Sequence, residues 1–331
     1  MINVAINGFG RIGRSAFRVS YNDPDINFVA VNDLLEIEQL AYLLRYDTVC
    51  GVLGADLEIR GDSLVVDGKA VKVLGEPDPA ALPWRDLGVD VVLDSTGIFL
   101  APDTAGLHLQ AGARKVALSA PPKGDVKMVV IGVNDETLTA DDTIVSNASC
   151  TTNCLAPLVK VLDDNLGLEH GFMTTVHAYT GGQTLIDGPS KKWRARRGRA
   201  AAANIVPTTT GAAKAVCKVL PHLDGRLDGM AMRVPVLNGS ITDLVCVVGR
   251  ETSVEEVNGF MSAAAQGPMS GILEYAVDPI VSADIIGNSH SSVFDSLSTK
   301  VNGNLVKAVS WYDNEWGYSC RLVDLMKKMA G

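Results

Sequence analysis

Cys150 is the residue whose surroundings most clearly suggest chemistry. It lies in the stretch Ser-Asn-Ala-Ser-Cys-Thr-Thr-Asn-Cys-Leu-Ala-Pro over residues 146–157, directly after the β-branched run 143–145. Apolar residues at helical spacing follow, which predicts a helix over about residues 152–164. The thiol would then lie near a helix N-terminus, where free N–H groups and the helix dipole lower its pKa and favour the thiolate nucleophile. The alternative interpretation is a small buried apolar side chain, as most cysteines are.

A nucleophilic thiol needs a base, and His177 is the best candidate among the five histidines. It ends a β-like run, residues 173–177, in a setting rich in threonine. The other histidines stay open as alternatives, and a structural histidine is the plainer interpretation of any one of them. They are His108, His170, His222 and His290.

Hydroxyl and guanidinium groups that could hold phosphate follow Cys150 along the chain. Arginine binds phosphate through a bidentate fork, and threonine and serine donate single hydrogen bonds. A basic run covers residues 191–199, for which a solvated loop or a weak anion patch is the alternative. The candidates are Ser149, Thr151, Thr208, Thr209, Thr210, Arg197 and Arg233.

The first half of the chain predicts a dinucleotide site. An apolar run over residues 2–6 leads into Gly8, Gly10 and Gly13, which match G-x-G-x-x-G and open a helix over residues 11–19. Asp33 follows a second apolar run and lies twenty residues after Gly13. At this spacing an acidic side chain binds the adenosine ribose, while the pyrophosphate rests on the helix N-terminus. A free carboxylate there favours NAD over NADP. The alternative interpretation of the whole motif is a glycine-rich turn in an unrelated α/β protein.

A hydride acceptor and a nucleophilic thiol together suggest oxidation of an aldehyde through a covalent intermediate. Cys150 would add to the aldehyde to form a thiohemiacetal, hydride would pass to NAD, and a thioester would remain. Backbone N–H groups at the start of the helix would hold the oxyanion.

The remaining pattern predicts an α/β protein. The first half should form a doubly wound, mostly parallel Rossmann sheet, with an inserted hairpin turning at Asp67-Gly68 and buried runs at 89–93, 116–118 and 128–133. The second half should form an α+β domain with a largely antiparallel sheet. Its expected strands are 230–236, 241–248 and 307–312, and its expected helices are 210–219, one from the Ser253 capping box to about 266, and 316–329.

Composition excludes several classes of protein. The chain has 331 residues, 47% apolar, with a formal charge of −9, which argues against a nucleic-acid partner held by bulk electrostatics. Six cysteines without a Cys-x-x-Cys spacing argue against a metal site and against a disulfide framework. We find no signal-peptide pattern and no apolar run long enough for a bilayer, so we expect a cytoplasmic protein without a membrane partner.

The chain resembles phosphorylating glyceraldehyde-3-phosphate dehydrogenase over essentially its full length. The stretches that carry the resemblance are residues 7–14, 146–154, 175–180, 233–235 and 311–319. The resemblance implies a cytoplasmic homotetramer of glycolysis or gluconeogenesis that converts glyceraldehyde 3-phosphate, phosphate and NAD to 1,3-bisphosphoglycerate and NADH. It also implies an NAD-binding domain over residues 1–149, joined by the last helix, about 315–331, and a catalytic domain over residues 150–314.

Site roles carried over by position follow from the same resemblance. Cys150 is implied as the nucleophile and His177 as the base that activates it. Thr180 and Arg233 are implied to bind the substrate's phosphate, and the loop 181–204 to pack against a neighbouring subunit's cofactor pocket. The residues implied for inorganic phosphate are Ser149, Thr151, Thr210, Gly211 and Arg197. Those implied for NAD, besides the three glycines, are Arg11, Ile12, Asp33 and Ser119, with Asn314 at the carboxamide.

Three departures from the family pattern stand out. Gly181-Gly182 replace the usual Asn-Asp, Pro77 stands where an arginine is common, and the basic loop is about two residues longer. Two alternatives remain beside the main hypothesis. One is erythrose-4-phosphate dehydrogenase, which releases a free acid. The other is a non-catalytic NAD-binding regulator or RNA-binding protein of the same fold, against which the −9 charge and the Cys150/His177 pair argue.

Overall fold

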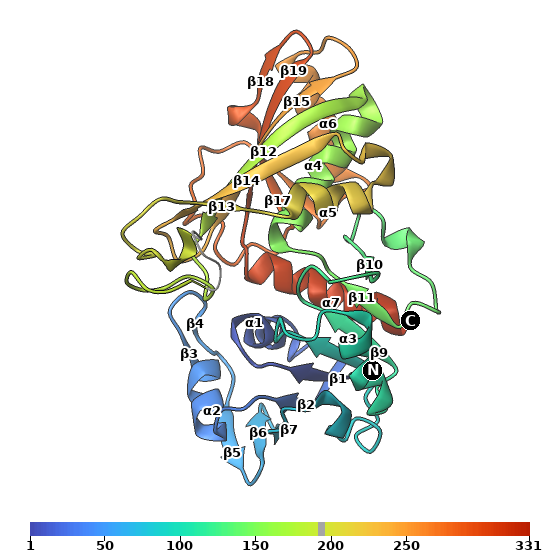
Figure 1. Cartoon of the computed structure of the whole chain (residues 1–331), viewed down its shortest axis with the longest axis vertical. Coiled ribbons are helices and arrows are strands. Elements are labelled where there is room, and N and C mark those ends of the chain that lie inside the picture. The colour runs from blue at the N-terminus through green and yellow to red at the C-terminus, as the bar shows by residue number, and fades with distance from the viewer. Residues whose placement is uncertain (191–195) are drawn as a thin grey trace. The chain divides into compact units, whose positions relative to one another are not determined.

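The computed structural model describes residues 1–190 and 196–331, which form two compact units (Figure 1). Unit 1 consists of residues 1–129, 135–148 and 319–331, and unit 2 of residues 130–134 and 149–318. Residues 191–195 of the predicted basic run lie outside the described residues. Among the helices that the structure describes, none has the length and apolar character needed to span a bilayer.

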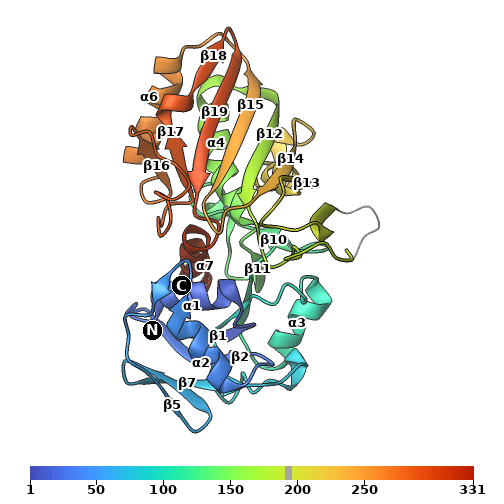
Figure 2. The ribbon, with the colours of Figure 1, turned by 90° about the vertical axis from the view of Figure 1, so that its left-hand side faces the viewer.

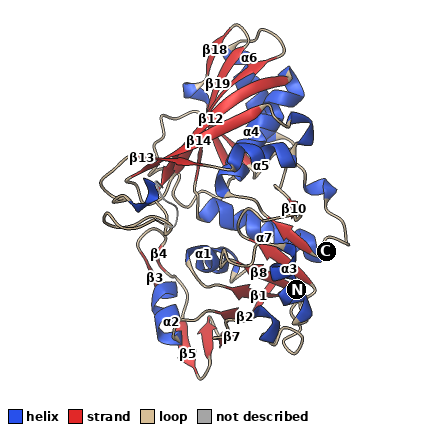
Figure 3. Cartoon of the chain, in the orientation of Figure 1, coloured by secondary structure: helices blue, strands red, loops and turns tan. Residues whose placement is uncertain are grey.

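Unit 1 is built on a nine-stranded sheet in the order β10-β11-β9-β8-β1-β2-β7-β6-β5 (Figure 3). The pairs from β10 to β7 are parallel, and only the β7-β6-β5 edge is antiparallel. The predicted doubly wound, mostly parallel fold is therefore confirmed. Its strands are β1 (Ile2–Asn7), β2 (Ile26–Asn32), β5 (Leu57–Arg60), β6 (Ser63–Val66), β7 (Lys69–Leu74), β8 (Val91–Asp94), β9 (Lys115–Leu118), β10 (Lys127–Met128) and β11 (Ile144–Ser146).

The inserted hairpin of unit 1 turns where the sequence predicts it. Asp67 and Gly68, between β6 and β7, have φ angles of 46° and 80°. Positive φ at both central residues is the requirement of a type I′ turn, whose twist matches the flanking strands. A second small hairpin joins β3 (Tyr46–Asp47) to β4 (Gly51–Val52).

Unit 1 contains the two helices that the sequence predicts over residues 11–19 and 316–329, together with two others. They are α1 (Arg11–Ser20), α2 (Ile37–Arg45), α3 (Pro102–Gln110) and the part of α7 (Trp316–Ala330) from Ser319 onward. Phe17 of α1 packs against Phe28 of β2 with ring centroids 4.8 Å apart. Near the other end of the chain, Lys327 of α7 pairs with Asp23 at 2.6 Å, so the last helix is tied to the loop after α1.

One predicted buried run joins the sheet only at its first residue. The run 128–133 is buried at Val129, Val130 and Val133, but of this run only Met128 pairs, in β10. The chain turns at Gly132, where φ is +82° and a Cβ atom would lie 3.1 Å from Ile272. The predicted burial of this run is therefore confirmed at its three valines, although most of the run is not a strand.

Unit 2 contains a mixed sheet in the order β13-β14-β12-β15-β19-β17-β16, with β18 beside β19. Among the described strand pairs, β12–β14 and β16–β17 are parallel and the others are antiparallel, as predicted. The strands are β12 (Leu168–Ala178), β13 (Val206–Thr209), β14 (Leu227–Val234), β15 (Ser240–Val248), β16 (Leu273–Ala276), β17 (Ser292–Asp295), β18 (Lys300–Asn302) and β19 (Leu305–Tyr312).

Three helices cover one face of this sheet (Figure 2). They are α4 (Cys150–Leu166), α5 (Ala212–Val219) and α6 (Val254–Gln266). On β12, Met173, Thr175 and His177 are buried, the intervening Thr174 and Val176 are half-buried, and the preceding Phe172 is 72% exposed. The alternation along β12 therefore turns His177 toward the helix-covered face that also carries α4.

The turn that precedes α4 places Cys150 at the first position of the helix. Ala148 is a buried residue with φ of +54°, a left-handed conformation that non-glycine residues seldom adopt. The hydroxyl of Ser149 then caps the helix by accepting the N–H of Thr152 at 3.1 Å. The predicted turn from strand to helix is thus confirmed, and the helix begins two residues earlier than the spacing indicated.

Candidate active site

Cys150 and His177 meet although 26 residues separate them in the chain. The Cys150 Sγ lies 3.5 Å from the His177 Nε2, with the thiol at the start of α4 and the imidazole near the end of β12. The imidazole is 3% exposed, so neighbouring groups rather than water fix its orientation. The structure thus brings together the two residues that the sequence analysis places in the chemistry.

The hydrogen bonds of His177 orient it as a base toward the thiol. Its Nδ1 lies 2.7 Å from the carbonyl oxygen of Ala178, so a proton on Nδ1 donates to that oxygen. The lone pair on Nε2 then faces the Cys150 Sγ. Arg233 Nη1 donates to the same carbonyl oxygen at 3.0 Å. It also lies 2.8 Å from Nδ1, but a guanidinium only donates, so in this tautomer that approach is not a hydrogen bond.

The surroundings of this pair favour the neutral form of both groups. Burial raises the pKa of the Cys150 thiol, although the positive charge of Arg233 and the hydrogen bonds of Thr151 oppose it. The lowered pKa expected at a helix N-terminus is therefore not found, because desolvation of the thiol outweighs these groups. Burial, followed by the charge of Arg233, lowers the pKa of His177 to about 3. The resting pair is a thiol hydrogen-bonded to a neutral imidazole.

The lowered pKa of His177 predicts an acid sensitivity. The unfolded chain takes up a proton at this histidine near pH 6.5, whereas the folded protein resists it down to about pH 3. Stability is therefore lost as the pH falls through this range, by on the order of 2–3 kcal/mol between pH 7 and pH 4. We expect the free energy of unfolding of His177→Gln, from denaturant titrations at both pH values, to fall less than that of the wild type. Equal losses would contradict this origin.

Tyr312 links the segments that carry Cys150 and His177, and sequence reasoning missed it. Its hydroxyl lies 2.8 Å from the Oγ1 of Thr151 and 2.8 Å from the Oγ1 of Thr175. Thr151 follows Cys150, and Thr175 lies on the same face of β12 as His177, so one buried hydroxyl joins α4 to β12. A usable signal was present, because a tyrosine in a buried strand needs a hydrogen-bond partner for its hydroxyl.

Tyr312→Phe is expected to loosen the active site. The change leaves two buried threonine hydroxyls without their shared partner, which costs about 1–3 kcal/mol of unfolding free energy. We expect kcat to fall about ten-fold because the thiol and imidazole are less firmly positioned. Steady-state kinetics and thermal melts measure both effects. Tyr275→Phe, a strand tyrosine of β16, serves as the control and should leave kcat unchanged; an unchanged kcat in Tyr312→Phe would contradict the positioning role.

Three buried donor atoms lack a hydrogen-bond partner among the described residues, and one of them belongs to Arg233, which lies beside His177. The Nε of Arg233, the Oγ1 of Thr208 and the Nε2 of Gln183 are buried atoms without a hydrogen-bond partner in the described structure. Burial and then the charge of Arg197 lower the pKa of Arg233, which places two guanidinium groups near each other. Such a cluster is costly without a bound anion, because burying unpaired donors and like charges opposes folding. The donor set therefore fits a phosphate group.

The other predicted phosphate residues have local roles in this structure. The N–H of Thr180 donates to Gln183 Oε1 at 3.4 Å, and Thr210 Oγ1 accepts the N–H of Ala212 at 3.2 Å, at the start of α5. Among the described residues, no atom lies within 4 Å of the position a Cβ atom would take at Gly211. A Cβ atom at Gly182, where the family pattern departs, would lie 3.7 Å from Arg197 Nη1.

Asn314 is linked to the strand end that carries His177. The hydroxyl of Ser240 accepts the N–H of Ala178 at 3.1 Å and donates to Asn314 Oδ1 at 2.7 Å. Because this bond makes Oδ1 the acceptor, the Asn314 amide nitrogen is left as the donor toward a ligand. Ser240 is a second residue that sequence reasoning missed.

The glycine turn of unit 1 fits a dinucleotide. A Cβ atom at Gly13 would lie 2.3 Å from the Gly8 carbonyl oxygen, so only glycine permits this approach. Gly10 has nothing within 4 Å of its Cβ position, which leaves its backbone accessible to a pyrophosphate at the N-terminus of α1. Asp33 follows β2, and its Oδ2 accepts the N–H of Phe9 at 2.8 Å, which ties the acidic residue to the turn.

The remaining predicted cofactor residues lie around this turn. Ile12 is the second residue of α1, and Ser119 follows β9, where its N–H donates to the Asp94 carbonyl oxygen at 3.0 Å. Arg11 forms an ion pair with Asp47 at 2.8 Å. Burial acts to raise the pKa of Asp47, but the Arg11 hydrogen bond and the N–H groups of Cys50 and Val49 lower it to about 2. Asp47 therefore stays ionised and holds the Arg11 side chain.

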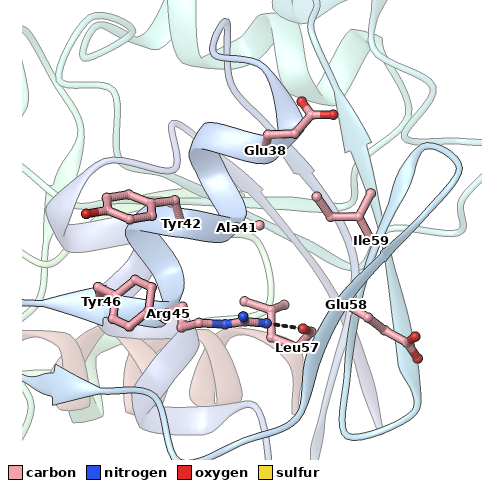
Figure 4. A pocket seen from close by; sticks show the side chains of 8 residues that line it. All are labelled: Glu38, Ala41, Tyr42, Arg45, Tyr46, Leu57, Glu58 and Ile59. Carbon is pink, nitrogen blue, oxygen red and sulfur yellow. Dashed lines mark hydrogen bonds between the residues drawn. The ribbon is translucent and has the colours of Figure 1, made fainter.

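A separate hollow lies between α2 and β5 (Figure 4). Arg45 crosses it and donates to the Leu57 carbonyl oxygen. Its walls contain none of the predicted site residues; they are Glu38, Ala41, Tyr42, Arg45, Tyr46, Leu57, Glu58 and Ile59.

Thiol-dependent NAD dehydrogenases have a parallel nucleotide-binding sheet like that of unit 1. They also have a thiol–imidazole pair like that of unit 2. Comparisons with known proteins narrow this class. Residues 2–102 match the family model described as glyceraldehyde 3-phosphate dehydrogenase, NAD binding domain, and residues 149–314 match the model of the C-terminal domain. The chain belongs to the glyceraldehyde-3-phosphate dehydrogenase family.

Curated relatives match along the whole chain. The glyceraldehyde-3-phosphate dehydrogenase of Kitasatospora aureofaciens is 55% identical over 332 residues, covering 100% of this chain and 99% of the relative. Glyceraldehyde-3-phosphate dehydrogenase 1 of Bacillus subtilis is 52% identical, and the Geobacillus stearothermophilus enzyme is 53% identical. Each of these two alignments covers 99% of this chain and 98% of the relative.

Proposed function

We propose that this protein is an NAD-dependent, phosphorylating glyceraldehyde-3-phosphate dehydrogenase that acts reversibly in glycolysis or gluconeogenesis. The observation that carries the proposal is the 3.5 Å approach of Cys150 Sγ to His177 Nε2, in a setting that also contains a buried, unpartnered arginine nitrogen. Family membership supports the same function. The roles given below to individual residues are part of the proposal.

The first bond forms at the thiol. His177 Nε2 takes the proton of Cys150 as the sulfur attacks the carbonyl carbon of the aldehyde, which gives a thiohemiacetal. Backbone N–H groups at the start of α4 face the developing oxyanion. NAD, when bound, supplies the hydride acceptor that turns this adduct into a thioester. Inorganic phosphate then attacks the thioester carbonyl, the C–S bond breaks, and the thiolate leaves with 1,3-bisphosphoglycerate as product.

A bound phosphate would make His177 a stronger base. The charge of Arg233 is the second cause, after burial, that lowers the pKa of His177, and the charge of Arg197 adds to it. A phosphate dianion beside these arginines offsets their charge and raises the pKa of the imidazole. Substrate binding would therefore favour transfer of the thiol proton to Nε2 at the moment when the nucleophile is needed.

The residues proposed to hold the two phosphates follow the family pattern. Thr180 and Arg233 would bind the phosphate of the substrate. The attacking phosphate would be bound by Ser149, Thr151, Thr210, Gly211 and Arg197. The Ser149 oxygen accepts a hydrogen bond in the helix cap, and the Thr151 hydroxyl pairs with Tyr312. Their O–H protons and the adjacent N–H groups would donate to the phosphate.

NAD would be held mainly by residues of the glycine turn and the strand ends that follow it. These are Gly8, Gly10, Arg11, Ile12, Gly13, Asp33 and Ser119, with Asn314 for the carboxamide. The open backbone at Gly10 and the accessible helix N-terminus support this assignment. The predicted domain roles go with it: residues 1–149 with the last helix, about 315–331, would bind NAD, and residues 150–314 would carry the chemistry.

A homotetramer in the cytoplasm is part of the proposal. The sheet face of unit 2 opposite its helices exposes apolar side chains, among them Phe172 at 72%, Met230 at 37% and Val245 at 36%. An apolar patch of this kind marks a protein contact surface. Size-exclusion chromatography with light scattering tests the tetramer.

NADH formation from glyceraldehyde 3-phosphate is expected to require inorganic phosphate or arsenate. The thioester needs an anionic acceptor, and without one turnover should stop after a single equivalent of NADH per active site. Absorbance at the NADH band, recorded with NAD or NADP and with or without phosphate, measures this. Equal turnover without either anion would sink the phosphorylating assignment. Preference for erythrose 4-phosphate would favour the related dehydrogenase, and NAD binding without turnover would favour a regulator.

A further inference from the structure

A buried chain of polar side chains lies under the glycine turn, outside the residues assigned above. It begins at Trp84, whose Nε1–H donates to His108 Nδ1 at 3.0 Å, and continues from His108 Nε2 to Asp94 Oδ2 at 3.1 Å. Trp84 and His108 are both 0% exposed, and Asp94 is 1% exposed. His108 projects from α3 and Asp94 ends β8, so the pair joins a helix to the carboxyl edge of the sheet.

The direction of each hydrogen bond is fixed by chemistry. An indole N–H only donates, so His108 Nδ1 must accept, and the proton of the neutral ring resides on Nε2. That proton points to Asp94. Asn32 Nδ2 donates to Asn7 Oδ1 at 2.8 Å, which leaves Asn7 Nδ2 to donate to Asp94 Oδ2 at 2.9 Å. All these donors therefore lead to one carboxylate.

Asp94 also holds the segment that touches the glycine turn. Its Oδ1 accepts the N–H of Thr96 at 3.1 Å and the hydroxyl of Thr96 at 2.8 Å. Gly8 has φ of +89°, and a Cβ atom there would lie 2.9 Å from the Cγ2 of Thr96. The hydroxyl of Ser95 donates to the Gly8 carbonyl oxygen at 2.5 Å. One carboxylate thus holds Asn7, which precedes the turn, and Thr96, which packs against it.

We infer that Asp94 and His108 are positioning residues for the cofactor site, which hold the glycine turn in the conformation that receives a dinucleotide. This inference rests on the proposed NAD-dependent function. Neither side chain is placed to touch the cofactor or the reacting atoms. Their action runs through Asn7 and Thr96, which fix the path of the backbone at Gly8 and so the approach of the pyrophosphate to α1.

The test compares His108→Phe with the wild type in the full-length protein. Phenylalanine keeps the ring but removes both hydrogen bonds, so Asp94 loses a donor and Trp84 an acceptor. We expect the Kd for NAD, from isothermal titration calorimetry, to rise about ten-fold, which corresponds to about 1.4 kcal/mol. The KM for NAD should rise with it. The KM for the aldehyde and the rate of Cys150 alkylation by iodoacetamide should stay within about two-fold. The substitution alters no hydrogen bond of Cys150 or His177.

Val65→Ala is the matched control. Val65 is a 3% exposed residue of β6 in the same unit, and its side chain takes no part in the polar chain. It should lower the melting temperature without changing the Kd for NAD. If both variants weaken NAD binding equally, the role of His108 is merely structural and the inference is overturned.

Two milder variants decide the matter if His108→Phe does not fold. Trp84→Phe removes only the donor to Nδ1, and His108→Gln keeps a donor near Asp94. We expect both variants to bind NAD more weakly than the wild type, though by less than His108→Phe. Without the Trp84 donor the His108 ring is no longer held in one orientation, and a glutamine donor meets Asp94 from a different position. If both variants bind NAD with wild-type affinity, the inference is overturned and the proposed function stands. If the wild type itself binds no NAD, the proposed function is overturned.

Discussion

Cys150→Ser is expected to lower kcat/KM for NADH formation by about 10⁴-fold or more, because a serine hydroxyl ionises far less readily than a thiol and gives no thioester. The fold should survive, since serine nearly matches cysteine in size and keeps its place at the start of α4. NAD binding by calorimetry and the thermal melt should match those of the wild type. The measurement is an initial rate at saturating aldehyde, phosphate and NAD, beside iodoacetamide labelling of the protein.

The second cysteine of the same helix provides the control. Cys154 is fully buried, lies 3.2 Å from the Thr242 hydroxyl, and has a pKa raised by burial to about 11. Cys154→Ser preserves the hydrogen bonds and should keep most of the activity, at some loss of stability. Full activity of Cys150→Ser, or its loss in Cys154→Ser with an unchanged Cys150 labelling rate, would contradict the assignment of the nucleophile.

His177→Gln is the second large effect, a loss of about 10²–10⁴-fold in kcat, because the thiol then lacks a general base. Glutamine can still hydrogen-bond to the Ala178 carbonyl oxygen, so the strand end should remain in place. We expect Cys150 to react more slowly with iodoacetamide at neutral pH and to recover part of its reactivity at high pH, where the thiol ionises unaided. The pH dependence of alkylation, with and without bound phosphate, measures this directly.

His222→Gln is the matched control for the base. His222 is a largely exposed histidine that bonds to Asp163 at 2.6 Å, remote in the chain from the proposed chemistry. It should retain the wild-type kcat and alkylation rate. A His177→Gln enzyme that keeps wild-type kcat would show that another group removes the thiol proton.

Local patterns predicted the fold of the dinucleotide half well. Each of its motifs is short, and neighbouring residues in the chain determine its conformation. The glycines, the following helix and Asp33 lie within one βαβ unit, so their geometry follows from spacing alone. The same holds for the hairpin at Asp67-Gly68 and for the placement of Cys150 at a strand-to-helix turn. In each case the chemistry of a few neighbouring residues decides the conformation.

The parts that sequence reasoning missed depend on contacts between distant segments. Tyr312 joins Thr151 to Thr175, Ser240 joins Asn314 to Ala178, and no spacing rule connects these positions. The pKa of Cys150 failed as a prediction for the same reason. A helix N-terminus can be inferred from sequence, but the desolvation that opposes it arises from the packed surroundings of the thiol.

The divided make-up of unit 1 has a consequence for how the chain folds during synthesis. Residues 1–148 contain all the strands of its sheet, but Ser319 and the rest of α7 complete the unit. At about 5–20 residues per second, a ribosome needs on the order of 10–35 seconds to make the segment between them. Throughout that time the surface that α7 covers is exposed, including Asp23, which later pairs with Lys327. The nucleotide-binding unit therefore begins folding first and is completed last, so its final assembly must wait for unit 2 to be translated.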